Sequence, residues 1–153
     1  MSKVKPVPEG HHTVAPYLVV DGAAAAMEFY TRAFGAQELF RMPGPNGAIM
    51  HAEIMIGDSP VMLCDASPET GSQSPQSLNG TPVSIFLYVP DVDGFVARAT
   101  AAGATLKVPL TNMFWGDRYA QLADPYGHVW QVATHVEDVA PDEMMRRATD
   151  TMG

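Results

Sequence analysis

The chain has 153 residues, 46% of them hydrophobic, which is enough for one ordinary domain or two small fused units with a real core. Its 17 acidic and 9 basic residues give a formal net charge of -8, so its field repels polyanions and nucleic acid is not expected as a partner. Cys64 is the only cysteine, which excludes an internal disulfide and a zinc site made of thiolates. No apolar run approaches the roughly 18 residues of a membrane span, and the first ten residues lack the apolar core of a secretory signal. The sequence therefore predicts a cytoplasmic protein with no membrane partner.

Residues 1–12 are predicted to form a flexible tail, because Pro6, Pro8 and Gly10 prevent regular structure. His11 and His12 end this tail, and adjacent histidines in such a place are more often solvated than bound to a metal.

A first unit is predicted over residues 13–66. Asp21 is expected to be the N-cap of an alanine-rich helix, and Gly35 ends that helix. Met27, Tyr30 and Phe34 recur at helical spacing and predict a stripe that covers a sheet. The elements follow in the order strand 13–20, helix 23–34, and strands 37–42, 49–56 and 61–65.

The same order of elements then repeats. Residues 67–82, rich in Pro, Gly, Ser and Gln, are predicted to be an exposed linker. In the second unit, residues 83–137, Asp91 caps a helix that Gly103 closes. Its strands are expected at 83–89, 104–109, 118–123 and 128–134, and a C-terminal segment, residues 138–153, contains a short helix at 141–149. The chain is expected to form one domain overall.

Aromatic residues are dense between Asn112 and Gln131. Within this stretch, Asp124-Pro125-Tyr126-Gly127 has the residues of a β-turn, with Asp first, Pro second and Gly fourth. The flanking segments read as half-buried strands, so the turn is predicted to be the bend of a hairpin.

Taken together, residues 13–137 resemble the vicinal oxygen chelate superfamily, which contains glyoxalase I, bleomycin-resistance proteins and extradiol dioxygenases. The resemblance rests on Glu28-Phe29-Tyr30 in the first helix and on the last turn, and the stretches 114–118 and 123–128 are similar to the PhnB-like branch. It implies an α+β fold of two tandem βαβββ units that form a curled, mixed-sheet half-barrel around a ligand, usually in a homodimer. Enzymatic members hold one divalent metal, with one ligand from each of four strands.

The resemblance places Ala15, Leu63, Ser84 and Gln131 at the four metal positions. Only the amide oxygen of Gln131 is a reasonable metal donor, so no metal and no other cofactor is expected. Other polar residues lie close enough to reopen the question, although a shift of one residue moves a side chain to the opposite face of its strand. They are His51, Glu53, Asp65, His128 and His135.

The ligand-binding residues predicted from the sequence are Tyr17, Phe114, Trp115, Arg118 and Gln131. Arg118 either pairs with a ligand carboxylate or stacks on a planar ligand, or it forms a salt bridge to Asp117 or Asp124. Phe114 and Trp115 either contact a ligand or plug the barrel mouth. Cys64 and His128 are expected to be structural.

These residues support three functions. The leading interpretation is a metal-free protein that binds a small, partly aromatic or apolar molecule in a cleft, as in sequestration or resistance. The alternative is a metal-dependent glyoxalase-, lyase- or dioxygenase-type enzyme acting on vicinal oxygens, in which Glu53 moves a proton. A third interpretation is a protein without a ligand, whose cleft serves assembly.

Overall fold

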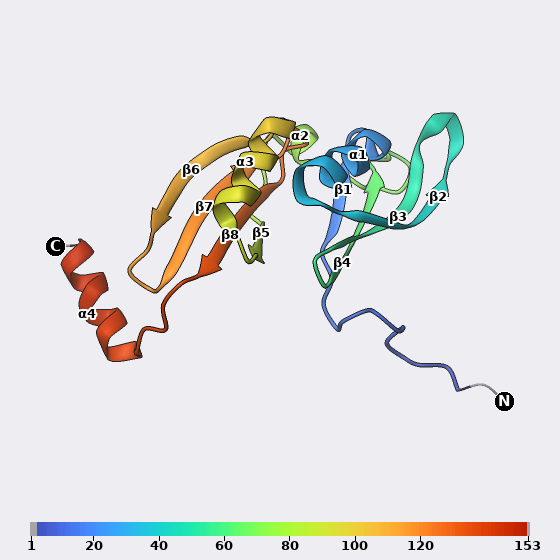
Figure 1. Ribbon diagram of the computed structural model, residues 1–153. Coiled ribbons are helices and arrows are strands. Elements are labelled where there is room, and N and C mark those ends of the chain that lie inside the picture. Colours follow the sequence, from blue (N-terminus) through green and yellow to red (C-terminus); the bar gives the residue numbers. More distant parts are fainter. Residues whose placement is uncertain (1–2, 153) are drawn as a thin grey trace. The chain divides into compact units, whose positions relative to one another are not determined.

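The computed structural model describes residues 3–152, and the chain divides into two compact units, Met1–Thr81 and Pro82–Gly153. Each unit is built on one strand, one helix and three further strands, in that order along the chain, and one further helix follows them (Figure 1). Each set of four strands forms one mixed sheet with two open edges. The α+β fold of two βαβββ units is confirmed.

In the first unit, the parallel pair β1 and β4 is extended by antiparallel β3 and β2, in the sheet order β1-β4-β3-β2. Helix α1 covers one face of this sheet, where it buries Met27, Tyr30 and Phe34 as its spacing predicted (Figure 1). Leu18 and Leu63 are buried beneath it. The elements are β1 Tyr17–Val20, α1 Ala23–Phe34, β2 Gln37–Pro43, the 3-10 turn Pro45–Gly47, β3 Ile49–Ile56, β4 Ser59–Asp65 and α2 Pro75–Leu78.

The N-terminus of α1 is capped from another strand. The N-cap residue is Gly22, with φ at 93°, and it contributes no side chain. Instead, one carboxylate oxygen of Asp65 accepts hydrogen bonds from the backbone N–H groups of Gly22 and Ala23, both at 2.8 Å. The prediction that Asp21 is the N-cap was therefore wrong. The carboxylate of Asp21 accepts a hydrogen bond from the hydroxyl of buried Ser74 at 2.9 Å.

The second unit has the same topology, with the sheet order β5-β8-β7-β6 and a parallel pair formed by β5 and β8. Helix α3 covers one face of the sheet, and Asp91 caps it by accepting a hydrogen bond from the N–H of Gly94, as predicted. The elements are β5 Ser84–Tyr88, α3 Val92–Ala102, β6 Thr105–Asn112, β7 Asp117–Ala123, β8 Val129–His135 and α4 Pro141–Met152.

Thr134, near the end of β8, repeats the contact that Asp65 makes at the end of β4. Its hydroxyl accepts a hydrogen bond from the N–H of Val92 at 2.8 Å and donates one to the carbonyl of Val89 at 2.7 Å. In both units, a side chain from the strand that comes last along the chain, β4 or β8, therefore fixes the first turn of the helix.

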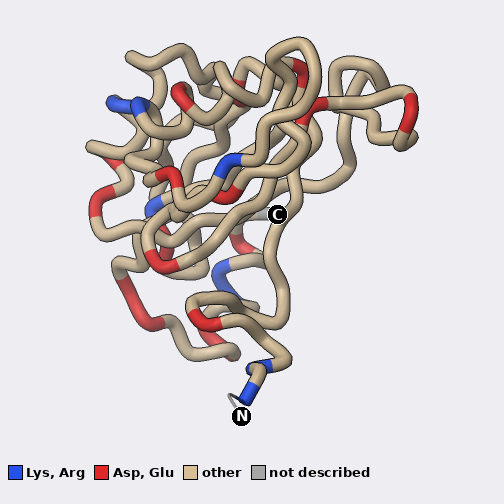
Figure 2. The backbone as a smooth tube through the Cα atoms, turned by 90° about the vertical axis from the view of Figure 1, so that its right-hand side faces the viewer, with Lys and Arg blue, Asp and Glu red and all other residues tan. Residues whose placement is uncertain are grey.

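The predicted linker is more ordered than its composition suggested. It contains α2, whose N-cap Ser74 is fully buried and accepts a hydrogen bond from the N–H of Ser77. Acidic residues outnumber basic ones in the sequence, and both are spread along the backbone tube (Figure 2). Among the helices that the structure describes, none combines the length and the apolar character needed to cross a membrane.

Candidate functional site

The two faces of the second sheet differ in what they carry. Side chains alternate along each strand, and Arg118 and Thr134 share the face that α3 covers, as their bonds to that helix and its N-terminus show. Trp130 and Val132 lie on this same face and are fully buried. The opposite face carries Ser84, Phe86, Tyr88, Tyr119 and Gln131, joined by Trp115 from the preceding loop; we call this set the aromatic face.

The rings of the aromatic face contact one another. The ring centroid of Phe86 lies 5.0 Å from that of Tyr88 and 6.2 Å from that of Tyr119, onto which it stacks. Trp115 meets Tyr119 edge to face at 6.1 Å. Phe86 is 42% exposed and Tyr88 65% exposed, so part of each ring is accessible to a molecule that contacts this face.

The carboxylate of Asp117 holds two of these rings in place. It is 1% exposed and accepts hydrogen bonds from the hydroxyl of Tyr88 at 2.8 Å, from the indole N–H of Trp115 at 3.0 Å and from Nδ1 of His135 at 2.8 Å. Burial alone would raise the pKa of Asp117, but these three donors outweigh it and lower that pKa. The aromatic face is therefore built around an ionised carboxylate whose oxygens are already occupied.

The polar centre of the aromatic face is a chain of hydrogen bonds. The hydroxyl of Tyr119 donates to the side-chain oxygen of Gln131 at 2.7 Å, and the amide nitrogen of Gln131 donates to the hydroxyl oxygen of Ser84 at 2.6 Å. Burial raises the pKa of Tyr119, which keeps its hydroxyl protonated. Gln131 therefore lies at the centre of the face, with Phe86 paired to it in the neighbouring strand.

Arg118 does not join these residues. Its guanidinium forms a two-pronged ion pair with Asp93 of α3, at 2.8 and 2.9 Å, and also donates to the side chain of Asn112. The hydrogen bonds from Arg118 lower the pKa of Asp93. Arg118 does form a salt bridge, but the partners considered from the sequence, Asp117 and Asp124, were wrong, and the carboxylate that it contacts is that of Asp93. Arg118 fixes α3 to the sheet on the face opposite Gln131.

Phe114 and Trp115 lie on a loop that is anchored on both sides. Their rings meet edge to face at 5.0 Å, and the carbonyl of Phe114 accepts a hydrogen bond from Arg147 of α4. The carbonyl of Gly116 accepts hydrogen bonds from the N–H groups of Val136 and Glu137. Phe114 contacts the aromatic face through Trp115, which the sequence analysis had paired with it.

Phe86 and Tyr88 belong to the aromatic face but were not predicted from the sequence. Both belong to a strand whose alternate residues are apolar on both faces, so they read as ordinary core positions. The alternation of side chains along a strand shows which residues share a face, but it does not show which of the two faces a helix covers. The available signal was that Phe86 and Tyr88 are aromatic while the alternate residues Ile85 and Leu87 are aliphatic.

The turn before β8 is structural. The carboxylate of Asp124 accepts hydrogen bonds from the backbone N–H groups of Tyr126 and His128, and its second oxygen accepts one from the indole of Trp130 at 2.8 Å. This arrangement confirms the β-turn, and the backbone of His128 is part of it.

Tyr17 belongs to the first unit and anchors a separate polar cluster there. Its hydroxyl lies 3.0 Å from Nδ1 of His51, and Nε2 of His51 lies 3.4 Å from a carboxylate oxygen of Glu53. The other oxygen of Glu53 lies 3.1 Å from Nε2 of His11. Burial, followed by the neighbouring Cys64 and Glu53, raises the pKa of Tyr17, so its phenol stays neutral. Leu63 lies on the other face of the sheet, beneath α1.

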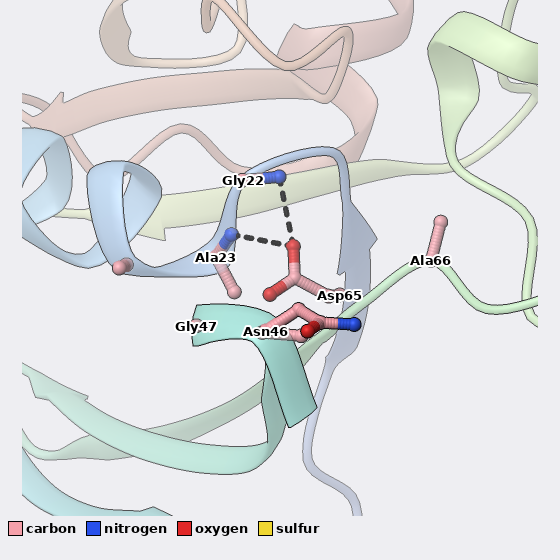
Figure 3. A pocket seen from close by; sticks show the side chains of 8 residues that line it. Gly22, Ala23, Asn46, Gly47, Asp65 and Ala66 are labelled. Atoms are coloured by element: carbon pink, nitrogen blue, oxygen red, sulfur yellow. Dashed lines mark hydrogen bonds between the residues drawn. The ribbon is translucent and has the colours of Figure 1, made fainter. Parts of the chain in front are cut away.

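A pocket of about 310 Å³ opens at the N-terminus of α1 (Figure 3). Asp65 points into it, but one of its oxygens is bonded to Gly22 and Ala23 and the other accepts the N–H of Ile49 at 2.8 Å. The carboxylate is thus used by the fold, and we assign no ligand to this pocket. It is lined by Gly22, Ala23, Ala24, Asn46, Gly47, Ala48, Asp65 and Ala66.

Comparison with known proteins agrees with this architecture. The sequence profile of the Glyoxalase/Bleomycin resistance protein/Dioxygenase superfamily matches residues 10–132, most of the chain. The chain belongs to this superfamily. An uncharacterized protein of Mycobacterium bovis, Mb0911c, is 48% identical over 134 residues, which cover 86% of this chain and 88% of that protein. The uncharacterized protein Rv0887c of Mycobacterium tuberculosis is also 48% identical over 134 residues, 86% of this chain and 79% of that protein.

Solved structures of the superfamily share the fold. TioX from Micromonospora sp. ML1 is 30% identical with a TM-score of 0.62, covering 80% of this chain and 99% of that one. The fosfomycin resistance protein FosX from Listeria monocytogenes, solved with Mn(II), is 16% identical with a TM-score of 0.63, covering 90% and 97%. A PhnB protein from Bacillus cereus is 17% identical with a TM-score of 0.61, covering 80% and 99%. At these last two identities the likeness concerns the fold alone.

The residues at the expected metal positions of this superfamily member do not fit a divalent ion. Gln131 already bonds Tyr119 and Ser84, and a neutral hydroxyl such as that of Ser84 is a weak ligand. The side chain of Leu63 has no atom that can coordinate a metal, and it is buried beneath α1. Within residues 3–152, no group of three or more His, Cys, Asp or Glu side chains has a geometry that could hold a metal ion.

Proposed function

We propose that this chain binds a small, partly aromatic or apolar molecule on its aromatic face, without a metal, in a sequestration or resistance role. The observation that carries the proposal is the cluster of Phe86, Tyr88 and Trp115, which presents ring surface around a polar centre. A sheet face of this kind has the composition of a ligand site, mostly apolar with a few placed polar groups. Exposed apolar patches on a folded chain commonly mark such contacts.

Two further features support binding over chemistry. The polar groups at the centre of the face, Ser84, Tyr119 and Gln131, are neutral and bonded to one another. Asp117 is ionised, but three protein donors surround it. None of these groups has the unsatisfied basic atom that proton abstraction requires.

The binding test uses calorimetric titration with 2-methylnaphthalene, a neutral aromatic probe, and with bleomycin. The Phe86→Ala variant lacks one of the aromatic rings that a ligand would cover. It should bind about tenfold more weakly, because roughly 1.4 kcal/mol of binding free energy from burial of that ring is lost. The matched control is Leu106→Ala. Leu106 is also 42% exposed but pairs with buried Leu122 on the α3 side, so its loss should leave binding unchanged. Equal effects of the two variants, or no binding of either probe to the unmodified chain, would exclude the proposed site.

A metal-dependent enzyme acting on vicinal oxygens is the second candidate. One observation favours it: the carboxylate of Glu53, which would move the proton in such an enzyme, lies between two imidazoles in the first unit, at 3.1 Å from His11 and 3.4 Å from His51. As arranged, these three side chains do not form a metal site, so the enzyme is the second candidate and not the first. Metal analysis of protein purified without chelator separates the candidates. We expect far less than one metal ion per chain. Stoichiometric nickel, zinc, iron or manganese that disappears in the Glu53→Gln variant would instead support the enzyme.

We also propose that the chain acts as a homodimer in the cytoplasm. Large apolar side chains are exposed on neighbouring strands of the first sheet, where Phe40 is 44% and Met50 60% exposed. Cys64, the only cysteine of the sequence, is buried and forms no disulfide. Light scattering should give twice the 16.4 kDa mass of one chain. A mass of one chain at micromolar concentration would contradict the dimer.

A further inference from the structure

The polar centre of the aromatic face has more hydrogens than the protein uses. A serine hydroxyl and a tyrosine hydroxyl each carry one hydrogen, and a glutamine amide carries two. The two bonds that join Tyr119, Gln131 and Ser84 use two of these four hydrogens, and two remain. The count does not depend on which way the amide of Gln131 is turned, because each of the two bonds takes one hydrogen in either orientation.

The remaining hydrogens have no acceptor in the described part of the chain. As assigned, they lie on the hydroxyl of Ser84 and on the amide nitrogen of Gln131, and neither group makes a further protein hydrogen bond there. An oxygen that already accepts one bond loses little when a second lone pair is unused. A donor hydrogen that is covered without an acceptor costs more. A molecule that covers this face must therefore supply acceptors.

The charge of the protein indicates which kind of hydrogen-bond acceptor a ligand of the aromatic face carries. The whole chain carries a net charge of -8, which disfavours an anionic ligand. The carboxylate of Asp117, two residues before Tyr119 on β7, lies on the same side of the sheet and is already paired with His135, so this pair adds no attraction for an anion. A carbonyl oxygen or a pyridine-type nitrogen accepts hydrogen bonds without adding negative charge.

We infer that the ligand of the aromatic face is a neutral, planar aromatic molecule carrying a carbonyl or ring-nitrogen acceptor, which the hydroxyl of Ser84 and the amide of Gln131 bind. This assignment rests on the proposed function, since it names the ligand class of the same face. The rings of Phe86 and Trp115 supply the stacking surface, and the polar centre selects among flat molecules of equal size.

The experiment compares three probes of one shape by calorimetric titration at pH 7. They are 2-methylnaphthalene, which has no polar group, 2-acetonaphthone, which has a neutral carbonyl, and 2-naphthoate, which is anionic. The ketone should bind roughly 3- to 10-fold more tightly than the hydrocarbon, the range that one neutral hydrogen bond gives, and the anion should bind more weakly than the ketone.

The triple variant Ser84→Ala/Tyr119→Phe/Gln131→Met locates the selectivity. Each single change removes a donor but also frees a hydrogen on a remaining partner, so only the variant that removes all four hydrogens should bring the affinity ratio of ketone to hydrocarbon close to one. The control Ser59→Ala removes a hydroxyl that bonds Asp58 in an exposed turn of the first unit, and it should keep the ratio of the unmodified chain.

The outcomes separate the ligand class from the function. Hydrocarbon and ketone binding equally well to the unmodified chain, or a preference for the ketone that survives in the triple variant, would overturn the acceptor assignment and leave the aromatic face as a binding site. Failure of all three probes to bind would overturn the proposed function and the assignment with it.

Discussion

Single residues fix the loop that carries Trp115, and Gly116 is the most constrained of them. Its φ is 102°, and a Cβ there would overlap the carbonyl oxygen of Glu137. The same glycine accepts the N–H groups of Val136 and Glu137 through its carbonyl. Close approach of two backbone segments therefore requires this residue to lack a side chain.

The Gly116→Ala variant should lose about 3 kcal/mol of unfolding free energy, because backbone strain and a clash with the Glu137 carbonyl add together. Gly47→Ala is the matched control, since Gly47 has a φ of 77° and open space around the added methyl, so only strain of about 1 kcal/mol applies. Urea unfolding measures both. Equal losses would show that the contact with Glu137 does not constrain the loop.

Arg118 shows at the same scale how a strong sequence signal acquires another role. Its aromatic neighbours Trp115 and Tyr119 suggested a ligand contact, but they lie on the other face of the sheet from its guanidinium. Tyr119 follows Arg118 on the strand and therefore points to the opposite face, and the loop before β7 places Trp115 against Tyr119 on that same face.

Among the elements, the first helix of each unit depends on the end of a distant strand. In the first unit, Asp65 at the end of β4 accepts three backbone N–H groups, from Gly22, Ala23 and Ile49. In the second unit, the hydroxyl of Thr134 takes the same place beside Val92. A carboxylate next to a helix N-terminus also interacts favourably with the helix dipole.

The Asp65→Asn variant keeps the shape of the side chain but loses its charge and points an amide N–H at a backbone donor. We expect a loss of about 2 kcal/mol in unfolding free energy, the scale of one charged hydrogen bond. Asp58→Asn is the control, because Asp58 is exposed and accepts a hydrogen bond from the neighbouring hydroxyl of Ser59. Far-UV circular dichroism during urea unfolding compares them. An Asp65→Asn loss no larger than that of the control would contradict the capping role.

For the whole molecule, the acidic composition makes stability depend on pH through the few cationic groups that pair with carboxylates. Nδ1 of His135 lies 2.8 Å from Asp117, and its Nε2 lies 2.7 Å from Asp138. These hydrogen bonds raise the pKa of His135 above its ordinary 6.5. A raised pKa means that the protonated ring stabilises the folded state fully below pH 6.5, and that this contribution disappears as the pH rises through the raised value.

The melting temperature of the unmodified protein should therefore fall as the pH rises above about 6.5 more steeply than that of the His135→Gln variant. The other four histidines are present in both proteins, so the difference between the two curves reports on His135. Parallel curves would show that the pair with Asp117 contributes nothing to the pH dependence. Asp117 acts in the opposite sense. Its lowered pKa makes its contribution present above its ordinary pKa of 3.8 and lost as the pH falls through the lower folded value.

The sequence by itself determined the local structure. Helix α1 runs over the predicted residues, β3 also matches, and Asp91 and the turn at Asp124 act as predicted. Hydrophobic periodicity, helix caps and turn residues act over a few positions, so they can be read without knowing the fold. The repeat of the element order followed from these local signals, and the superfamily was indicated by the resemblance of residues 13–137 to its members.

Only the tertiary structure decided which atoms meet. Asp65 and not Asp21 caps α1, because the end of β4 lies beside the helix, and Gln131 is bonded to Ser84 across a parallel strand pair. The same packing of α3 on one face of the sheet turned Arg118 towards Asp93 and left Phe86 and Tyr88 on the other face. Strand alternation states which side chains share a face, but the helix that covers one of the two faces decides which of them remain available to a ligand.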